Sequence, residues 1–559
     1  MAYLKSKTLF FTTSPRTPLK MIPEIQVLYN NFEGKKWNTK TQVEFIKKLA
    51  EGNDFDGKGS EKDLAFSARD RINRAPKALG FVDLKPHINL TEAGENFISG
   101  KRTEEVLLRQ LLKFQLPSPY HMEPEKFKGI FCVKPYLEIF RLIYELGTIS
   151  FDELMIFGMQ LTHYNKFDSI VAEIKTFRRM KLYAKLSYKT FRGNYLKEQV
   201  EKIYADDIND GNTKTRESRD KSIDKFVTTK SRNLRDYADA CFRYLRATGM
   251  VEISQRGHSI SIMPEKRKEV EFFLSMVDRK PVYIDDENNY KKYLFDGSVP
   301  ELYSDNRFRL IEQVKEVTGK SEALEEHTTN ELKDILENAI ANKKKQIISK
   351  QITELKEYKN YADVMDTFDD IKNNVLYDAP LMLEWNTWRA MTMLDGGDIK
   401  ANLKLDDKGQ PMSTAAGNMS DIVCDYDDFG LAVEVTMQSG QKQYETEGEP
   451  VSRHLAKLKK ETGKDAYCLF IAPKINESCI AYFYALHTMN IAFYGGKSVI
   501  VPLELDVFIN MVEQSYNAGY VPNPQQVKSI FEYSLEQAKN SVDEKEWYAK
   551  VKEKALNWL

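Results

Sequence analysis

The sequence predicts a multidomain protein that combines α+β and α/β architecture in three parts. The N-terminal half repeats a pattern of a basic helix followed by two short strands. A middle stretch shows helical periodicity with few strand signals, and strands alternate with helices towards the C-terminus. We therefore expect winged-helix-like subdomains in residues 1–275, a helical linker in residues 276–375, and an α/β/α domain in residues 376–559. The length of 559 residues suits several domains, since each usually holds roughly 100–200 residues.

The N-terminal repeat has one copy in residues 66–94 and another in residues 235–263. Each copy predicts a basic helix that stops at a glycine, Gly80 or Gly249, and then a strand, a turn and a second strand. A helix followed by a hairpin is the end of a winged-helix module. A third helix-turn-helix candidate includes Ser150, which can cap a helix with acidic residues in its first turn. Winged helices bind DNA or other proteins, so the pattern alone leaves both open.

Charge is distributed unevenly, although the net charge is only −1. Residues 1–275 hold 48 Lys and Arg against 36 Asp and Glu, and the remainder holds 34 against 47. A basic half joined to an acidic half indicates a region that binds a polyanion. Ordinary compositional drift is the simpler alternative.

The five cysteines are scattered and form no C-x-x-C motif, which argues against a disulfide framework and a structural zinc site. No apolar run reaches the roughly 18 residues of a membrane span, and the N-terminus lacks the apolar core of a signal peptide. We therefore expect no membrane partner and a cytoplasmic location.

A basic stretch with interspersed aromatic residues, 175–195, lies between the two repeats. Such a stretch suits contact with phosphates, sugars and bases, although a solvated amphipathic helix and hairpin would look the same. Residues 206–232 are polar and charged, and we expect a loop or arm there.

The C-terminal third predicts a mixed sheet covered by helices. The expected strands are 422–424, 431–436, 466–472 and 498–503, and the expected helices are 381–394, 445–461 and the tail 522–559.

Two carboxylates fall on neighbouring predicted strands of this sheet. Asp421 opens one strand and Glu434 lies on the next, and a hairpin of that length can bring both to one edge. Oxygen ligands on adjacent strands are a natural Mg²⁺ site, because this hard cation leaves room for waters and a phosphate. Asp and Glu on neighbouring strands are common, so the pair alone is a weak signal.

Catalytic sites of this layout usually carry a lysine two residues after the second carboxylate, and this sequence has Thr436 there. A further carboxylate on the following helix, Glu447, can assist, and Lys442, His454 or Lys457 can supply a positive charge. The simpler interpretation of Glu447 and its acidic neighbours is a loop before a helix N-terminus. Two segments resembling the end of a P-loop lack the upstream glycine, which excludes that nucleotide-binding motif.

Several motifs in a fixed order resemble the AlwI-type family of type IIS restriction endonucleases, which includes site-specific nicking enzymes and large subunits of heterodimeric restriction enzymes. In the N-terminal half they are residues 14–18, 31–34, 66–71, 79–82, 113–118, 232–239 and 243–244; in the C-terminal half they are 383–385 with Trp388, 415–418, Asp421, 434–436, 447–450, 453–454 and 468–473.

The resemblance implies a C-terminal PD-(D/E)xK cleavage domain with Mg²⁺ as cofactor, and cutting of double-stranded DNA a short fixed distance outside an asymmetric site. It assigns the catalytic carboxylates to Glu384, Asp421, Glu434 and Glu447, with Asp421 and Glu434 as metal ligands. One such centre cuts one strand. Double-strand cleavage would therefore need a small second nuclease subunit, a transient self-dimer or sequential nicking.

We expect the N-terminal half to hold the DNA through basic side chains, with arginine favouring guanine in the major groove. The predicted DNA-binding residues are Arg16, Arg69, Arg71, Arg74, Arg232, Arg235 and Arg243. The alternative function is a non-catalytic winged-helix DNA-binding regulator, which the missing lysine at position 436 slightly favours.

Overall fold

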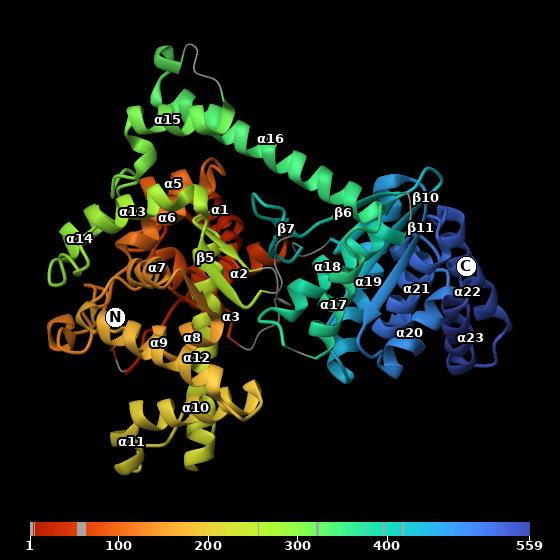
Figure 1. Cartoon of the computed structure of the whole chain (residues 1–559), viewed down its shortest axis with the longest axis horizontal. Coiled ribbons are helices and arrows are strands. Elements are labelled where there is room, and N and C mark those ends of the chain that lie inside the picture. Colours follow the sequence, from red (N-terminus) through yellow and green to blue (C-terminus); the bar gives the residue numbers. More distant parts are fainter. Residues whose placement is uncertain are drawn as a thin grey trace. The chain divides into compact units, whose positions relative to one another are not determined.

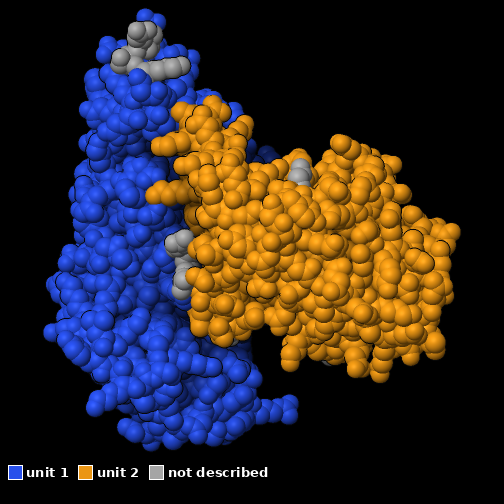
Figure 2. All heavy atoms as spheres, turned by 45° about the vertical axis from the view of Figure 1, so that its right-hand side comes forward, with its two compact units in different colours: residues 1–338 blue, residues 339–559 orange. Residues whose placement is uncertain are grey.

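The computed structural model describes residues 4, 6–52, 63–254, 257–319, 324–373, 375–394, 397–415 and 419–559. The chain divides into two compact units, residues 1–338 and 339–559, coloured separately in Figure 2. This division falls inside the segment predicted as a helical linker, so the three-part boundaries stay a prediction. None of the described helices has the length and apolar content needed to cross a membrane.

The first unit opens with a helical region (Figure 1), which has a small hairpin before its last two helices. Strands β1 (Val82–Asp83) and β2 (Asn89–Leu90) pair antiparallel at the predicted place. Gly80 ends the preceding helix with a φ of +78°, where a Cβ atom would collide with Leu294. The helices of this region are α1 (Met21–Phe32), α2 (Thr39–Ala50), α3 (Leu64–Ile72), α4 (Ala75–Ala78), α5 (Glu92–Ile98) and α6 (Thr103–Lys113).

The next region carries a three-stranded antiparallel sheet in the order β3-β5-β4. Ser150 caps its second helix, as the sequence predicts, and Glu153 returns the bond in a capping box. The loop expected for residues 206–232 is wrong in part, because a long helix begins at Ile223 after the cap Ser222. The elements are α7 (Pro135–Leu146), β3 (Thr148–Ser150), α8 (Phe151–Ile156), α9 (Phe167–Tyr183), α10 (Tyr188–Ile203), α11 (Ala205–Asn209), α12 (Ile223–Arg246), β4 (Val251–Ile253) and β5 (Ser259–Ile262).

Helices continue from there to the start of the second sheet, in agreement with the helical periodicity. They are α13 (Arg267–Met276), α14 (Glu287–Phe295), α15 (Arg307–Thr318), α16 (Thr329–Lys356) and α17 (Tyr361–Lys372). Short 3-10 helices occupy Pro18–Lys20, Pro124–Phe127, Gly158–Gln160, Tyr164–Lys166, Pro264–Lys266, Tyr303–Asp305, Leu324–Glu326 and Ala492–Tyr494.

The second unit is built on a five-stranded mixed sheet in the order β12-β11-β10-β9-β6. Strands β6, β9 and β10 are antiparallel neighbours, whereas β10, β11 and β12 run parallel. Central strands are mostly apolar because both faces are covered, with Glu434 and Asp465 as the charged exceptions in β10 and β11, and these two strands are buried at nearly every position. The strands are β6 (Asp398–Ala401), β9 (Ile422–Asp425), β10 (Phe429–Val435), β11 (Asp465–Ala472) and β12 (Ile500–Glu504), with a separate hairpin of β7 (Lys404–Leu405) and β8 (Pro411–Ser413).

Helices pack on this sheet in two groups: α18 contacts α21, and α19 contacts α20. Helix α19 begins at Gln441, so Glu447 lies within a helix and the alternative of an acidic loop is wrong. The core includes Trp547, whose indole N–H donates to the carbonyl of Ser534 at 3.1 Å. The helices are α18 (Ala379–Leu394), α19 (Gln441–Thr462), α20 (Glu477–Thr488), α21 (Leu505–Ala518), α22 (Pro524–Asn540) and α23 (Glu544–Leu556).

Candidate functional site

Asp421 and Glu434 meet at one end of the β9–β10 ladder. Ile422 pairs with Val433, so the antiparallel register places Asp421, one residue earlier, across from Glu434, one residue later. The backbone N–H of Val435 donates to Oδ2 of Asp421 at 2.8 Å, which fixes this carboxylate beside β10. The predicted pair of carboxylates is therefore brought together.

Two further carboxylates join this pair from the flanking helices. Glu384 comes from α18 and accepts a hydrogen bond from the backbone N–H of Ala415 at 2.8 Å. Glu447 comes from the N-terminal part of α19. The negative charges of Asp421 and Glu434 act on Glu384, and the charge of Glu447 acts on both Asp421 and Glu434. The four residues therefore form one carboxylate cluster: Glu384, Asp421, Glu434 and Glu447.

The carboxylate cluster combines buried and accessible groups. Glu384 and Glu434 are 3% and 6% exposed, whereas Asp421 and Glu447 are partly exposed. Desolvation, and secondly repulsion between the carboxylates, raises the pKa of Glu384, Asp421 and Glu434 above the usual range. Such clustered, desolvated acids are typical of a functional site, because a positively charged ligand would relieve both costs.

Thr436 replaces the usual lysine and binds Glu447 directly. Its hydroxyl donates to Oε1 of Glu447 at 2.9 Å and accepts from the backbone N–H of Gln438 at 3.1 Å. The hydroxyl thus fixes one carboxylate of the cluster. The sequence shows only that Thr436 stands where a lysine is usual, and it could not indicate this role. Burial raises the pKa of Glu447, and this hydrogen bond opposes the rise.

His454 contacts Glu434 from α19. Its Nδ1 lies 2.9 Å from Oε1 of Glu434, and both side chains are almost buried. Burial, and secondly the neighbouring Arg453, lowers the pKa of His454 to about 4, so the imidazole is neutral at pH 7. The lowered pKa disfavours His454 as the source of the positive charge, and the identity of that source stays a prediction. With Glu434 ionised, Nδ1–H is the donor and orients the carboxylate.

The other two candidates for a positive charge, Lys442 and Lys457, are exposed on α19. Glu434 instead receives a favourable electrostatic contribution from Arg453, and its carboxylate accepts a hydrogen bond from the side chain of Ser420. Sequence reasoning missed the contributions of Ser420 and of the Ala415 N–H, although Ala415 belongs to the motif at 415–418.

A divalent cation fits the donors of this cluster. Mg²⁺ prefers oxygen ligands, keeps several waters and needs only one or two protein carboxylates besides the phosphates of its substrate. In the described parts of the chain, no group of three or more His, Cys, Asp or Glu side chains is placed so that it could hold a metal ion. Asp421 and Glu434 therefore suit a cation that completes its coordination with water and phosphate.

The predicted DNA-binding arginines fall into two groups. Arg232 and Arg235 are exposed on α12 and form no ion pair with any residue that the structure describes. The other five have partners within the protein: Arg16 with Asp236 and Asp239, Arg69 with Gln42, Arg71 with Glu24, Arg74 with Asp70, and Arg243 with Asp239.

Arg16 and Arg71 line a pocket of about 430 Å³ beside Phe66, whose side chain is 52% exposed. Arg16 reaches the pocket from the N-terminal arm. This arm is held against α12 by the bond of Arg16 to Asp236 at 2.8 Å and by a hydrogen bond from the hydroxyl of Tyr244. DNA contact by the seven arginines stays a prediction.

Comparison with known proteins gives one extensive match. A sequence model described as AlwI restriction endonuclease matches residues 77–511, and a search of curated proteins returned no match. The small subunit (R.BspD6I2) of the heterodimeric restriction endonuclease R.BspD6I is 28% identical, covering 34% of this chain and 98% of its own, with a TM-score of 0.29. The BpuJ1 endonuclease binding domain, solved with pyrene- and phenanthrene-modified DNA, is 13% identical, covering 49% of this chain and 90% of its own, with a TM-score of 0.32. Both TM-scores are low, so the fold and the site rest on the geometry above.

Proposed function

The chain belongs to the AlwI restriction endonuclease family, and on this premise we propose that it is a type IIS, Mg²⁺-dependent deoxyribonuclease that cuts outside an asymmetric site. The carboxylate cluster carries the proposal, because four acids that converge at one end of a buried sheet are costly without a cation. The order of β6, β9, β10, α19 and β11 supports assignment of the second unit to the PD-(D/E)xK type.

We assign binding of Mg²⁺ to Asp421 and Glu434. When bound, this cation supplies Lewis-acid stabilisation of charge at the scissile phosphate and makes a coordinated water more acidic. His454 orients Glu434, and the backbone N–H of Val435 holds Asp421. These contacts fix both ligands before the substrate arrives.

Glu447 is the group we assign to positioning the attacking water. The carboxylate is partly exposed, and the Thr436 hydroxyl fixes one of its oxygens, so the other oxygen is available to accept a hydrogen bond from water. Glu384 assists from the buried side, where the Ala415 N–H holds it. Attack on phosphorus breaks the bond to the 3′ oxygen and leaves a 5′-phosphate and a 3′-hydroxyl.

We propose that the first unit recognises the DNA. The order α7, β3, α8, α12, β4, β5 with the sheet β3-β5-β4 is that of a winged helix with α9–α11 inserted before its recognition helix. In this assignment α12 enters the major groove, and the exposed Arg232 and Arg235 are available to bases or phosphates.

One carboxylate cluster cuts one strand in this proposal. Double-strand cleavage then needs a small second nuclease subunit, a transient self-dimer or sequential nicking. We also propose a cytoplasmic location, where the DNA substrate lies.

Cleavage of supercoiled plasmid with Mg²⁺ tests the function. Asp421→Asn removes one ligand charge, and we expect loss of cleavage with retention of DNA binding in EDTA. The matched control is Asp425→Asn, at the other end of the same strand, where Asp425 is exposed and pairs with Lys464 at 2.8 Å. Full activity of Asp421→Asn, or equal loss in both variants, would refute the assignment. An inactive wild type that still binds DNA would favour the regulator.

A further inference from the structure

The tip of the α9–α10 helical hairpin carries positive charge that the protein itself does not neutralise. Residues 175–192 include seven Lys and Arg and no Asp or Glu. Three of the seven pair with carboxylates outside the tip: Lys175 with Glu145, Arg178 with Glu153, and Arg192 with Asp152. The other four are exposed and form no ion pair within the described chain: Arg179, Lys181, Lys185 and Lys189.

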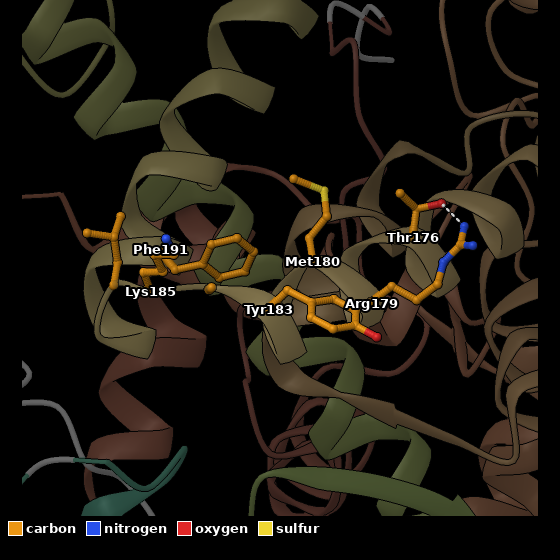
Figure 3. Close-up of a pocket in the computed structure, with 8 residues that line it drawn as sticks. Thr176, Arg179, Met180, Tyr183, Lys185 and Phe191 are labelled. Atoms are coloured by element: carbon orange, nitrogen blue, oxygen red, sulfur yellow. Dashed lines mark hydrogen bonds between the residues drawn. The ribbon is translucent and has the colours of Figure 1, made fainter.

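An apolar pocket lies between these cations. It has a volume of about 610 Å³, and Figure 3 shows Met180, Tyr183 and Phe191 around it, with Arg179 and Lys185 also in its lining. Phe191 stacks on the buried Phe177 with 5.4 Å between ring centroids, which packs α10 against α9.

Apolar side chains at the tip itself project into solvent. Tyr183 and Leu182 are 83% and 80% exposed, and Leu186 is 55% exposed. Nothing in the described part of the first unit covers them, and an exposed apolar patch of this kind marks a surface that meets a ligand.

The hairpin is anchored to the helix that we assign to the major groove. Helix α10 packs against α12, and Lys197 of α10 lies 3.4 Å from Asp224 of α12. Helix α12 carries Arg232 and Arg235, which are exposed and form no ion pair with any residue that the structure describes. The α9–α10 hairpin, with its cations that form no ion pair, is therefore packed against α12, which also presents such cations.

We propose that the α9–α10 tip is a second, sequence-independent contact to duplex DNA, made to DNA flanking the recognition site. Arg179, Lys181, Lys185 and Lys189 contact phosphates, and Tyr183 and Leu186 pack on deoxyribose. Unpaired cations interleaved with exposed aromatic and aliphatic groups suit a backbone that alternates phosphate and sugar. An acidic amphipathic protein segment is the competing occupant, but the connection to α12 favours DNA. The inference rests on the proposed function of the first unit.

The test measures DNA affinity against salt concentration in EDTA, so that cleavage does not enter. The variant Lys181→Gln/Lys185→Gln/Lys189→Gln removes three exposed charges. Each phosphate contact contributes about 0.9 to the slope of log K against log salt, so we expect the slope to decrease by about 2.7. The ratio of the DNA affinity of the wild type to that of the variant then decreases about 40-fold between roughly 50 and 200 mM salt. We expect the same decrease for cognate and unrelated duplexes.

A matched control removes the same net charge elsewhere in the first unit. Lys126, Lys128 and Lys268 are exposed but each faces a carboxylate, and we expect their triple glutamine variant to keep the wild-type slope. The apolar part is tested by Tyr183→Ser/Leu186→Ser, which should weaken binding without changing the slope, because apolar contacts release no counterions.

The outcomes separate this inference from the proposed function. If the wild type binds DNA and the tip variant keeps its slope, the tip contact is overturned and an acidic protein becomes the better occupant. If the control lowers the slope as much as the tip variant does, net charge explains the effect and the contact is also overturned. Failure of the wild type to bind any duplex would instead remove the proposed function itself.

Discussion

Thr436→Val is the substitution that most sharply tests how the carboxylate cluster works without a lysine. Valine has nearly the same shape as threonine but cannot donate to Glu447 or accept from the N–H of Gln438. We expect the fold to persist and cleavage to slow, because Glu447 loses the contact that fixes its orientation.

The magnitude follows from the contact that is lost. A hydrogen bond to a charged group contributes about 1.5–3 kcal/mol. If this contribution applies fully in the transition state, the rate of cleavage decreases about 10- to 150-fold. Because Glu447 is partly exposed and can be solvated, the lower part of this range is expected.

The assay is single-turnover nicking of supercoiled plasmid at saturating enzyme and Mg²⁺. Thr436→Ser keeps the hydroxyl and should retain most of the activity, whereas Thr462→Val removes a hydroxyl at the distant end of α19 and should be neutral. Wild-type rates for Thr436→Val, or an equal loss in Thr436→Ser, would refute the role assigned to the hydroxyl.

Three further predictions concern the cluster and the first unit. His454→Ala should lower cleavage about 10- to 100-fold and raise the Mg²⁺ concentration needed for half-maximal activity, since it frees Glu434; an unchanged Mg²⁺ dependence would contradict this. Mg²⁺ should raise the Tm of the wild type but not of Asp421→Asn, as differential scanning fluorimetry would show, because only the intact cluster binds the cation; equal shifts would contradict this. Lys113→Met should lower the free energy of unfolding by about 2–4 kcal/mol, measured by urea denaturation, because the carbonyls of Tyr293, Leu294 and Asp296 lose their shared donor. Burial lowers the pKa of Lys113 to about 7, so the unfolded chain binds more protons between about pH 7 and 10, and the stability of the wild type relative to Lys113→Met should rise with pH over that interval.

Strands β9, β10, β11 and β12 were predictable because most of their residues meet apolar surroundings, whereas β6, β7 and β8 were not predicted. Residues 466–472 form one uninterrupted apolar run, and the observed strand begins one residue earlier at Asp465. Local signals were equally reliable at Ser150, where the cap and Glu153 lie three residues apart. The resemblance to the AlwI-type family is confirmed by the match over residues 77–511, although the motifs at 14–18, 31–34 and 66–71 lie outside that range.

The start of α12 was mispredicted because its exposed face is polar and charged. Its buried positions, such as Phe226 and Leu234, are too widely spaced among charged residues to outweigh the loop-like composition around them.

The motif at 415–418 lies partly outside the described residues, since 416–418 have no described placement.

The sequence could place Asp421 across from Glu434 because a hairpin links them directly. It could not show that Thr436 binds Glu447, since this contact joins the end of a strand to the face of a helix. A weaker signal existed for His454, which follows Glu447 by seven residues and therefore lies on the same face of α19 two turns later. The partner of His454, Glu434, still required the folded structure.

The central claim is that Asp421 and Glu434 share one divalent cation. Crystals of the wild type grown with a duplex and Mn²⁺, which scatters anomalously, would locate it directly. We predict an anomalous peak between the two carboxylates, absent from the Asp421→Asn crystals. A well-ordered duplex with no peak there, or with the peak at another group of residues, would contradict the account.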